Sequence, residues 1–419
     1  MRVSFWIYLG AVLVTVVVGL FFYMHRSKTP AERGYYADGP HGRETKVAVR
    51  IRRDAANVTV DTRLVRGNNT LAFRLLQTEV ARHPKGNVLL APPVLLQSLS
   101  LAMNGAGPAT RTRLEAAAGV HGMSGDDLNI ANATLLQLLQ RADQNAGLTL
   151  GYGVWAPAGH AFNSAFTSQA EDLYSAEIGV LDPAKVNAWA QLQSVGRVET
   201  LLPAAADGVV LGSLATLNAA WEDAFDAKET VQAPFYLADG SRVTVPMLTH
   251  TGSYPYCENS QFQAIALPYS SGRLALYVIL PAANVPLAAF EGAMKVDNWE
   301  SWMNSFASRK VTLALPRMSL STNEDYAAAL GVAGAADFHD MLAGASPTLA
   351  QVRHAAQLET WEAGTATGAA IDRSAVPEKV ALPDSGPAVS MTLTRPFFLA
   401  VREKTSGALF FIGSVQDPR

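Results

Sequence analysis

Residues 350–379, AQVRHAAQLETWEAGTATGAAIDRSAVPEK, decide the fold of this chain. The first eleven alternate as a strand does. One side carries Val352, His354, Ala356, Leu358 and Thr360, and the other carries Arg353, Gln357 and Glu359. The residues that follow are too small and too rich in threonine for a core, and too uncharged at their start for a solvated loop. We interpret them as a segment that can become a second strand.

A strand that slides into a sheet beneath a covering helix needs side chains of period two with one small, uncharged face. Such a face is present in Thr365, Thr367, Ala369 and Ile371. β-Branched side chains favour the extended form, and Gly364 and Gly368 keep the segment mobile. Each inserted residue adds backbone hydrogen bonds worth roughly 1 kcal/mol net.

Composition limits the function classes. Of the 419 residues, 49% are hydrophobic and 16% charged, which is enough to bury a large core and excludes wholesale disorder. The net charge of −3 and the pI of about 6.3 give no basic field for nucleic acid, which we exclude as a partner. The single cysteine, Cys257, cannot form an intramolecular disulfide, and we expect it to pack in the core.

The N-terminal residues 1–28 are predicted to be a membrane anchor. Residues 3–24 carry no charge, and as a helix they would be about 33 Å long, which matches a hydrocarbon core of about 30 Å. A long signal peptide is the alternative, although no small-x-small cleavage site is evident. The flanking charges slightly favour a cytoplasmic body, but long domains translocate regardless of them. Residues 29–62, with the cluster Arg50, Arg52 and Arg53, form a polar linker.

The body, residues 63–419, begins with helical patterns and continues with strands. Helices are predicted within 68–83, 92–106, 109–120, 131–144, 164–176 and 186–196, and a short buried strand within 87–91. Strands follow at 209–221, 233–247 with the turn Asp239-Gly240, 262–281, 310–320, 350–360, 389–403 and 408–415. This order indicates an α+β fold.

From about residue 63 to 417 the chain resembles the serpin family. The stretches that carry the likeness are NVLLAPPVLLQSLSLAMNGA at 87–106, NAAWEDAFDAKET at 218–230, LPRMSLSTNEDYAAALGVAGAADF at 315–338 and PFFLAVREKTSGALFFIGSVQDP at 396–418. The resemblance implies a large mixed or antiparallel central sheet with covering helices, C-terminal β-hairpins and an exposed reactive-centre loop at about 362–387. It also implies that a helix follows the strand at 315–325.

The resemblance implies a protease inhibitor rather than an enzyme, acting as a suicide substrate. A serine or cysteine protease would cleave the loop, and insertion of the loop into the sheet would trap the acyl-enzyme. Such a body belongs outside the cytoplasm, in the periplasm or the extracellular space, and is secreted if the N-terminal segment is cleaved. No cofactor is implied. A polyanion on Arg111 and Arg113 is conceivable in this family, but two arginines on one helix are more often solvated.

The resemblance assigns three groups of residues. The family hinge is matched by Glu362, Gly364 and Thr365, followed by the small run Thr367, Gly368, Ala369 and Ala370; the breach tryptophan by Trp221; and the shutter histidine by His354. Where the family usually has an asparagine partner for that histidine, this chain has Ser213. Two usual serines are replaced by Ala91 and Val94, so His354 is expected to have fewer hydrogen-bond partners. A core histidine with satisfied bonds is the alternative interpretation.

The bond that a protease would attack is not fixed by the sequence. Counting forward from Glu362 places it at Glu378-Lys379, whereas counting back from Pro396 places it near Ser385-Gly386. Lys379 and Arg373 are alternatives to Glu378, because a trypsin-like protease needs a basic residue before the bond.

A rival interpretation is a non-inhibitory serpin-fold binding protein without the insertion switch. It is favoured by Ala91, Val94, Ser213 and Arg373 and opposed by the small run from Thr365 to Ala370. Ala366, in place of a usual acidic residue, faces outward and is tolerated. By the same alternation as Thr365 and Ile371, the Arg373 side chain would point to the covered face of the sheet, where a buried charge is costly. A hydrolase is suggested only by PDSGPA at 383–388, and the chain has no G-x-S-x-G, S-x-x-K or H-E-x-x-H motif. No metal-ligand spacing is present either.

Overall fold

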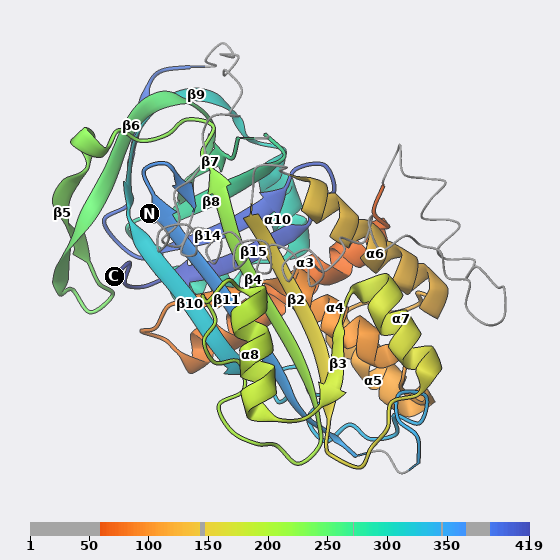
Figure 1. Ribbon diagram of the computed structural model, residues 1–419. Coiled ribbons are helices and arrows are strands. Elements are labelled where there is room, and N and C mark those ends of the chain that lie inside the picture. Colours follow the sequence, from red (N-terminus) through yellow and green to blue (C-terminus); the bar gives the residue numbers. More distant parts are fainter. Residues whose placement is uncertain (1–58, 143–146, 271, 345–346, 366–385) are drawn as a thin grey trace, which may run out of the picture. The chain divides into compact units, whose positions relative to one another are not determined.

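The central sheet of the computed structural model has six strands in the order β10-β11-β12-β4-β2-β3 (Figure 1). The pairs β11–β4 and β2–β3 are parallel and the remaining pairs antiparallel, so the sheet is mixed. Its strands are β2 (Gly147–Ala156), β3 (Glu177–Val180), β4 (Val209–Ala220), β10 (Met318–Asp325), β11 (Leu349–Trp361) and β12 (Gly364–Thr365).

A second sheet has nine strands, in the order β1-β15-β14-β8-β7-β6-β9-β13, with β5 paired to β6. Its strands are β1 (Val88–Leu90), β5 (Val231–Tyr236), β6 (Arg242–Glu258), β7 (Phe262–Pro268), β8 (Leu274–Pro281), β9 (Ala307–Pro316), β13 (Val389–Thr392), β14 (Phe397–Glu403) and β15 (Leu409–Val415). The hairpin of β14 and β15 lies in its interior, and both strands are almost wholly buried.

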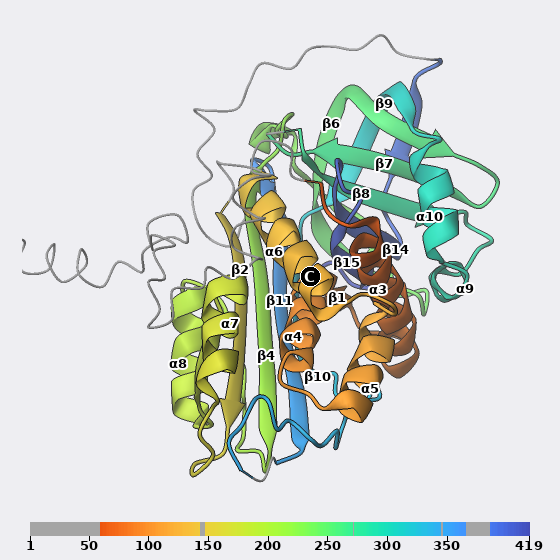
Figure 2. The same ribbon diagram turned by 90° about the vertical axis from the view of Figure 1, so that its right-hand side faces the viewer.

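Helices cover both faces of the central sheet, as Figure 2 shows. The helices of the described residues are α3 (Thr62–Arg82), α4 (Pro92–Met103), α5 (Pro108–Ala118), α6 (Gly125–Ala142), α7 (Ser164–Tyr174), α8 (Pro183–Gln193), α9 (Leu287–Gly292) and α10 (Val296–Met303), with a 3-10 turn at Ala227–Glu229. Of these, α9 and α10 lie beside the nine-stranded sheet instead. On one face, Val186 and Ala190 of α8 pack on Val210 and Leu214 of β4. On the other face, α4 lies between β4 and β15, and every residue of α4 is buried.

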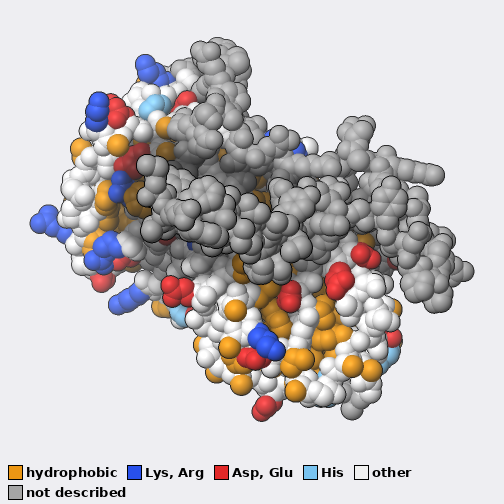
Figure 3. Space-filling model, viewed as in Figure 1, with side chains coloured by type: hydrophobic (Ala, Val, Ile, Leu, Met, Phe, Trp, Pro, Cys, Tyr) orange, Lys and Arg blue, Asp and Glu red, His pale blue; other side chains and the backbone are white. Residues whose placement is uncertain are grey.

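The structure describes residues 59–142, 147–270, 272–344, 347–365 and 386–419. These belong to one compact unit that extends from Ala56 to Arg419. On the face shown in Figure 3, Lys and Arg side chains gather near β5 and β6, whereas hydrophobic side chains appear around α8. Leu192 and Val195, at the end of α8, are 78% and 82% exposed.

The predicted α+β class and mixed central sheet are confirmed, but several elements differ from the prediction. Strand β2 was not predicted because glycines interrupt its alternation. A Cβ on Gly153 would lie 2.2 Å from the Trp155 ring, so packing requires glycine there despite its low strand propensity. Strand β3 and helices α9 and α10 are short and were also not predicted.

The helix expected after β10 was wrong. Residues 326–338 form successive turns, because Gly331 and Gly334 adopt left-handed conformations with φ of 70° and 69°. Two predicted single strands each divide into two. Residues 310–320 divide at Arg317, where the chain passes from β9 in one sheet to β10 in the other, and residues 389–403 divide before Pro396 into β13 and β14.

Candidate functional site

The two central strands of the six-stranded sheet are paired directly along most of their length and separated at one end. Parallel pairing of β11 with β4 runs from Leu349 opposite Val209 to Gln357 opposite Thr216. Beyond that point β12 lies between them: Gly364 and Thr365 pair with Ala220 and Ala219 on β4, and with Trp361 and Thr360 on β11. The first residues of the small, Thr-rich segment therefore already form a strand in the sheet.

Thr365 is held by an aromatic pair. Its side chain is fully buried, and its Oγ1 lies 2.7 Å from the hydroxyl of Tyr269, which follows β7. The Tyr269 ring stacks on Trp221, with centroids 4.7 Å apart and planes at 14°. Burial raises the pKa of the Tyr269 hydroxyl, and its bond to Thr365 only partly offsets this effect, so the group stays protonated.

The turn between β11 and β12 is fixed by the segment that follows β4. The Trp221 indole N–H donates to the carbonyl of Trp361 at 2.9 Å, and the Trp221 backbone N–H donates to the carbonyl of Ala363 at 3.0 Å. Phe225 donates its backbone N–H to the carbonyl of Glu362 at 2.9 Å. Three backbone carbonyls of the turn thus have partners on one neighbouring segment.

The Glu362 side chain is fixed as well. It forms an ion pair with Arg317 and accepts a hydrogen bond of 2.8 Å from the Thr230 hydroxyl. The Arg317 guanidinium also lies over the Trp361 ring, 4.5 Å from its centroid. Burial alone would raise the pKa of Glu362, but hydrogen bonds from Thr230, its own backbone and Arg317 lower it on balance. Glu362 is therefore a carboxylate at neutral pH.

His354 of β11 connects this strand to β4 and to the start of α4. It lies opposite Ser213 in the β11–β4 register and is fully buried. Its Nε2 accepts from the backbone N–H of Ala91, just before α4, at 3.1 Å. The proton of the neutral ring is therefore on Nδ1, which donates to Ser213 Oγ at 3.0 Å, and Ser213 can donate onward to the carbonyl of Arg353 at 3.3 Å.

The expectation that His354 has few partners was wrong. Both ring nitrogens are bonded, because the backbone of Ala91 supplies the donor that a serine side chain was expected to supply. Burial lowers the pKa of His354 to about 3, so the ring is neutral at physiological pH.

The predicted polar side of β11 also needs correction. Arg353 was placed on it, but only 8% of its surface is exposed. Its Nε donates to the carbonyl of Leu201 at 2.8 Å and its Nη2 to the carbonyl of Asn323 at 3.1 Å. The loop between α8 and β4 covers this face and supplies the acceptor, which alternation along one strand does not reveal.

Sequence reasoning missed Tyr269, Arg317 and Thr230. Tyr269 ends a strand beside a hairpin loop, and Arg317 follows a proline between two strand patterns; neither has a local pattern that indicates a contact with residues 362–365. The only available signal was Pro316, which marks a break between strands.

Several predicted site residues lie outside the described residues. They are Thr367, Gly368, Ala369 and Ala370 of the small run, and the candidate reactive residues Arg373, Glu378 and Lys379. The predicted anchor, residues 1–28, also lies outside the described part. Within that part, no helix is long and apolar enough to cross a membrane.

Other candidate sites have different surroundings. In the described part of the chain, no group of His, Cys, Asp and Glu side chains could hold a metal ion, and Cys257 is buried. Arg111 pairs with Glu115, and Arg113 donates to the carbonyls of Gly331 and Ala333, so both predicted polyanion residues have partners within the protein.

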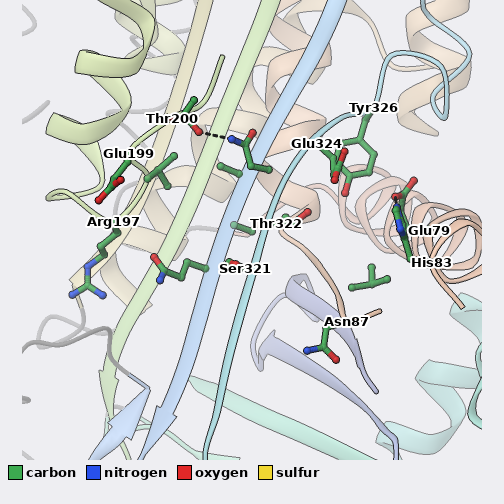
Figure 4. Close-up of a pocket in the computed structure, with 16 residues that line it drawn as sticks. Glu79, His83, Asn87, Arg197, Glu199, Thr200, Ser321, Thr322, Glu324 and Tyr326 are labelled. Atoms are coloured by element: carbon green, nitrogen blue, oxygen red, sulfur yellow. Dashed lines mark hydrogen bonds and ion pairs between the residues drawn. The ribbon is translucent and has the colours of Figure 1, made fainter. Parts of the chain in front are cut away.

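A pocket of about 370 Å³ follows the edge strand β10 (Figure 4). Its lining comes from both faces of the sheet, with Glu79 and Tyr326 on the side of α3 and Arg197 and Glu199 on the side of α8. None of the residues that hold β12 lines it. The contacts that hold residues 361–365 and this pocket are therefore separate features.

Comparisons with known proteins agree with this architecture. The rice protein "Probable non-inhibitory serpin-Z9" (Oryza sativa subsp. japonica) is 28% identical over 80% of this chain and 82% of its own length. Wheat Serpin-Z1B (Triticum aestivum) is 27% identical over 87% and 99%. The structure of tengpin, a thermophilic serpin, in the native state superposes with a TM-score of 0.76 at 20% identity, over 86% of this chain and 95% of tengpin.

Human thyroxine-binding globulin in complex with thyroxine also superposes with a TM-score of 0.76 at 20% identity, over 85% of this chain and all of that one. The model of the family described as "Serpin (serine protease inhibitor)" matches residues 66–418. This match covers most of the sequence and both sheets. The chain belongs to the serpin family.

Proposed function

We propose that the protein inhibits a serine or cysteine endopeptidase as a suicide substrate. The observation that carries the proposal is the position of β12, which pairs with both β11 and β4 and is antiparallel to each. A loop that continues in this direction would enter the sheet one residue at a time. After cleavage, its free end would allow insertion to continue with the acyl-enzyme attached.

The registers of β12 define the path of insertion. Continued unchanged, they place residue 371 opposite Ser213 on β4 and opposite His354 on β11. The inserted strand would therefore replace the Ser213–His354 hydrogen bond and separate two strands that are now paired. One parallel ladder is exchanged for two antiparallel ones, with a net gain of roughly 1 kcal/mol for each added hydrogen bond.

The same registers identify the main obstacle. Thr365, residue 367, residue 369 and Ile371 would share the face of Ser213, which α4 covers. Arg373 would follow between Leu211 and Val352, both with no exposed surface. An unpaired charge there costs several kcal/mol, so we propose that insertion proceeds readily to residue 372 and is resisted beyond it.

The rival proposal is a binding protein of serpin fold without a working trap. Arg373 and the similarity to a rice relative named as probably non-inhibitory favour it. The buried position of Thr365 and its bond to Tyr269 favour insertion instead, because a loop that never enters the sheet does not need a strand there.

The deciding experiment incubates the full chain with trypsin-like, chymotrypsin-like, glutamyl-specific and papain-like proteases. Products are examined by denaturing gel and mass spectrometry. We expect an SDS-stable complex with at least one protease and a cleavage site at Glu378, Lys379 or Arg373. Cleavage of the loop by every protease without a stable complex would refute inhibition and leave the binding protein.

We also propose that residues 1–28 anchor the protein in a membrane with the body outside the cytoplasm. The support is the uncharged run from residue 3 to residue 24. Alkaline extraction of membranes and N-terminal sequencing of the mature protein test this proposal. A soluble product that begins after residue 28 would show a cleaved signal peptide instead.

A further inference from the structure

Helix α9 carries a carboxyl group in an unusual place. Glu291 has no exposed surface, and in the described part of the chain neither carboxyl oxygen has a hydrogen-bond partner of normal geometry, although the Ser414 hydroxyl lies near enough to act on the group. It forms no ion pair with any residue in the described part of the chain. A carboxylate without a partner in such a site is costly, whereas the neutral acid is tolerated.

The packing of α9 is apolar and uncharged. The Phe290 ring stacks on Trp302 at 5.5 Å and meets Phe262 of β7 at 5.7 Å. From α3, the Gln77 amide donates to the backbone carbonyls of Glu291 at 3.1 Å and Met294 at 2.9 Å. These contacts hold the helix in place without supplying a positive charge to the carboxyl group.

The charged groups on the elements around α9 have other partners. On α3, Arg66 pairs with Asp297 of α10, Arg74 donates to carbonyls of α5, and Glu79 pairs with Arg82. On β14, the Glu403 carboxylate accepts a hydrogen bond from the Ser406 backbone N–H and forms an ion pair with Arg273. The Arg402 side chain forms a hydrogen bond with Tyr277 of β8. Strand β15 has no titratable residue, and Lys295 and Glu300 beside α9 are exposed.

Burial raises the pKa of Glu291 to about 8, and the Ser414 hydroxyl on β15 offsets only part of this effect. An exposed glutamate titrates near 4.5. Between these two values the packed helix holds a proton that the unpacked helix releases. Packing of α9 is therefore strongest below about pH 4.5 and weakens as the pH rises toward 8.

We propose that Glu291 makes the docking of helix α9 on α3 and β14 dependent on a bound proton, so that α9 opens progressively as the solution passes from acidic to mildly alkaline. The device does not depend on the reactive loop or on inhibition. Because one proton is released on opening, the opening equilibrium rises about tenfold per pH unit across this range and levels off above it.

Hydrogen exchange of the full chain, followed by mass spectrometry from pH 5 to pH 9, tests the proposal. After correction for intrinsic exchange rates, protection of the peptide covering residues 287–303 should fall about tenfold per pH unit up to pH 8. Glu291→Gln keeps the shape and removes the titration, so its protection should not vary with pH. Amides of β4 serve as the internal reference.

A second variant shows whether the effect of Glu291→Gln comes from the lost titration or from altered packing. Ser414→Lys places a cation beside the carboxyl group and should also flatten the pH dependence, because the ionised form then has a partner. Equal pH dependence of residues 287–303 in the original protein and in Glu291→Gln would overturn the proposal. So would protection in the original protein that is constant from pH 5 to pH 8.

Discussion

The hydroxyl of Tyr269 lies 2.7 Å from Oγ1 of Thr365, and both residues are fully buried. This bond joins the end of a strand in the nine-stranded sheet to the strand that enters the six-stranded sheet. The bond thus holds the start of the proposed reactive loop directly, and it can be removed by deleting one oxygen atom.

Tyr269→Phe should loosen β12. The Thr365 hydroxyl would remain buried without its partner, at a cost of about 1–3 kcal/mol. Hydrogen exchange at residues 361–365 should quicken accordingly. Tyr254→Phe, which removes a hydroxyl bonded to His250 at 2.7 Å, is the matched control and should leave these residues unchanged. Unchanged exchange at residues 361–365 in Tyr269→Phe would show that the bond does not hold the hinge.

Arg373→Ala should make insertion more complete. Continued unchanged, the β12 registers would bring residue 373 between Leu211 and Val352, where a charge is costly by several kcal/mol. The loop-cleaved form of Arg373→Ala should therefore melt at a higher temperature than the cleaved original protein. Lys379→Ala is the control, since it lies beyond the proposed stopping point. Equal melting temperatures of the two cleaved forms would mean that Arg373 reaches solvent.

The fold class followed from the sequence because its signals are local, whereas the assignment of residues 362–370 as a hinge stays a prediction. Alternation at 350–360 and the small, Thr-rich run after it predicted a strand and its extension, and Gly364 and Thr365 do form β12. The bonds that hold this strand come from Tyr269, Arg317 and Trp221, which lie far away in the chain. Only the pairing of the two sheets brings these residues together, so no sequence spacing reveals them.

Acid should weaken the pairing of β4 with β11. His354 is buried and neutral, with a pKa lowered by burial to about 3 from its ordinary 6.5. The unfolded chain therefore binds a proton that the native protein excludes. The stabilisation is fully present above pH 6.5 and is lost as the pH falls toward 3, at about 1.4 kcal/mol per pH unit.

Chemical denaturation between pH 7 and pH 4 measures this effect. His354→Gln cannot titrate in this range and should show a smaller loss of unfolding free energy. His339→Asn is the control, because His339 is exposed and its pKa is raised by Asp337, so its removal should not reduce the loss. If His354→Gln lost as much unfolding free energy in acid as the original protein, the acid sensitivity of the β4–β11 pairing would not come from this ring.

Val195→Gly should stabilise the protein. Val195 follows α8 with a φ of 54°, a left-handed conformation that a β-branched residue adopts at a cost of about 1–2 kcal/mol. Its side chain is 82% exposed, so little packing is lost when it is removed. We expect a gain of about 1 kcal/mol in unfolding free energy. Gly196→Ala, at a φ of 80°, should have the opposite effect, and a destabilised Val195→Gly would show that the exposed side chain has a contact role.

The most direct test of the central claim is the thermal stability of the full chain after its loop is cut. A protease that cleaves between residues 373 and 386 is removed, the cut is located by mass spectrometry, and the melting temperatures of the intact and cleaved proteins are compared by calorimetry. Insertion beside β12 predicts that the cleaved form melts at a far higher temperature, because the residues up to about 372 have joined β11 and β4 as a strand. A cleaved form that melts at or below the temperature of the intact protein would contradict the account.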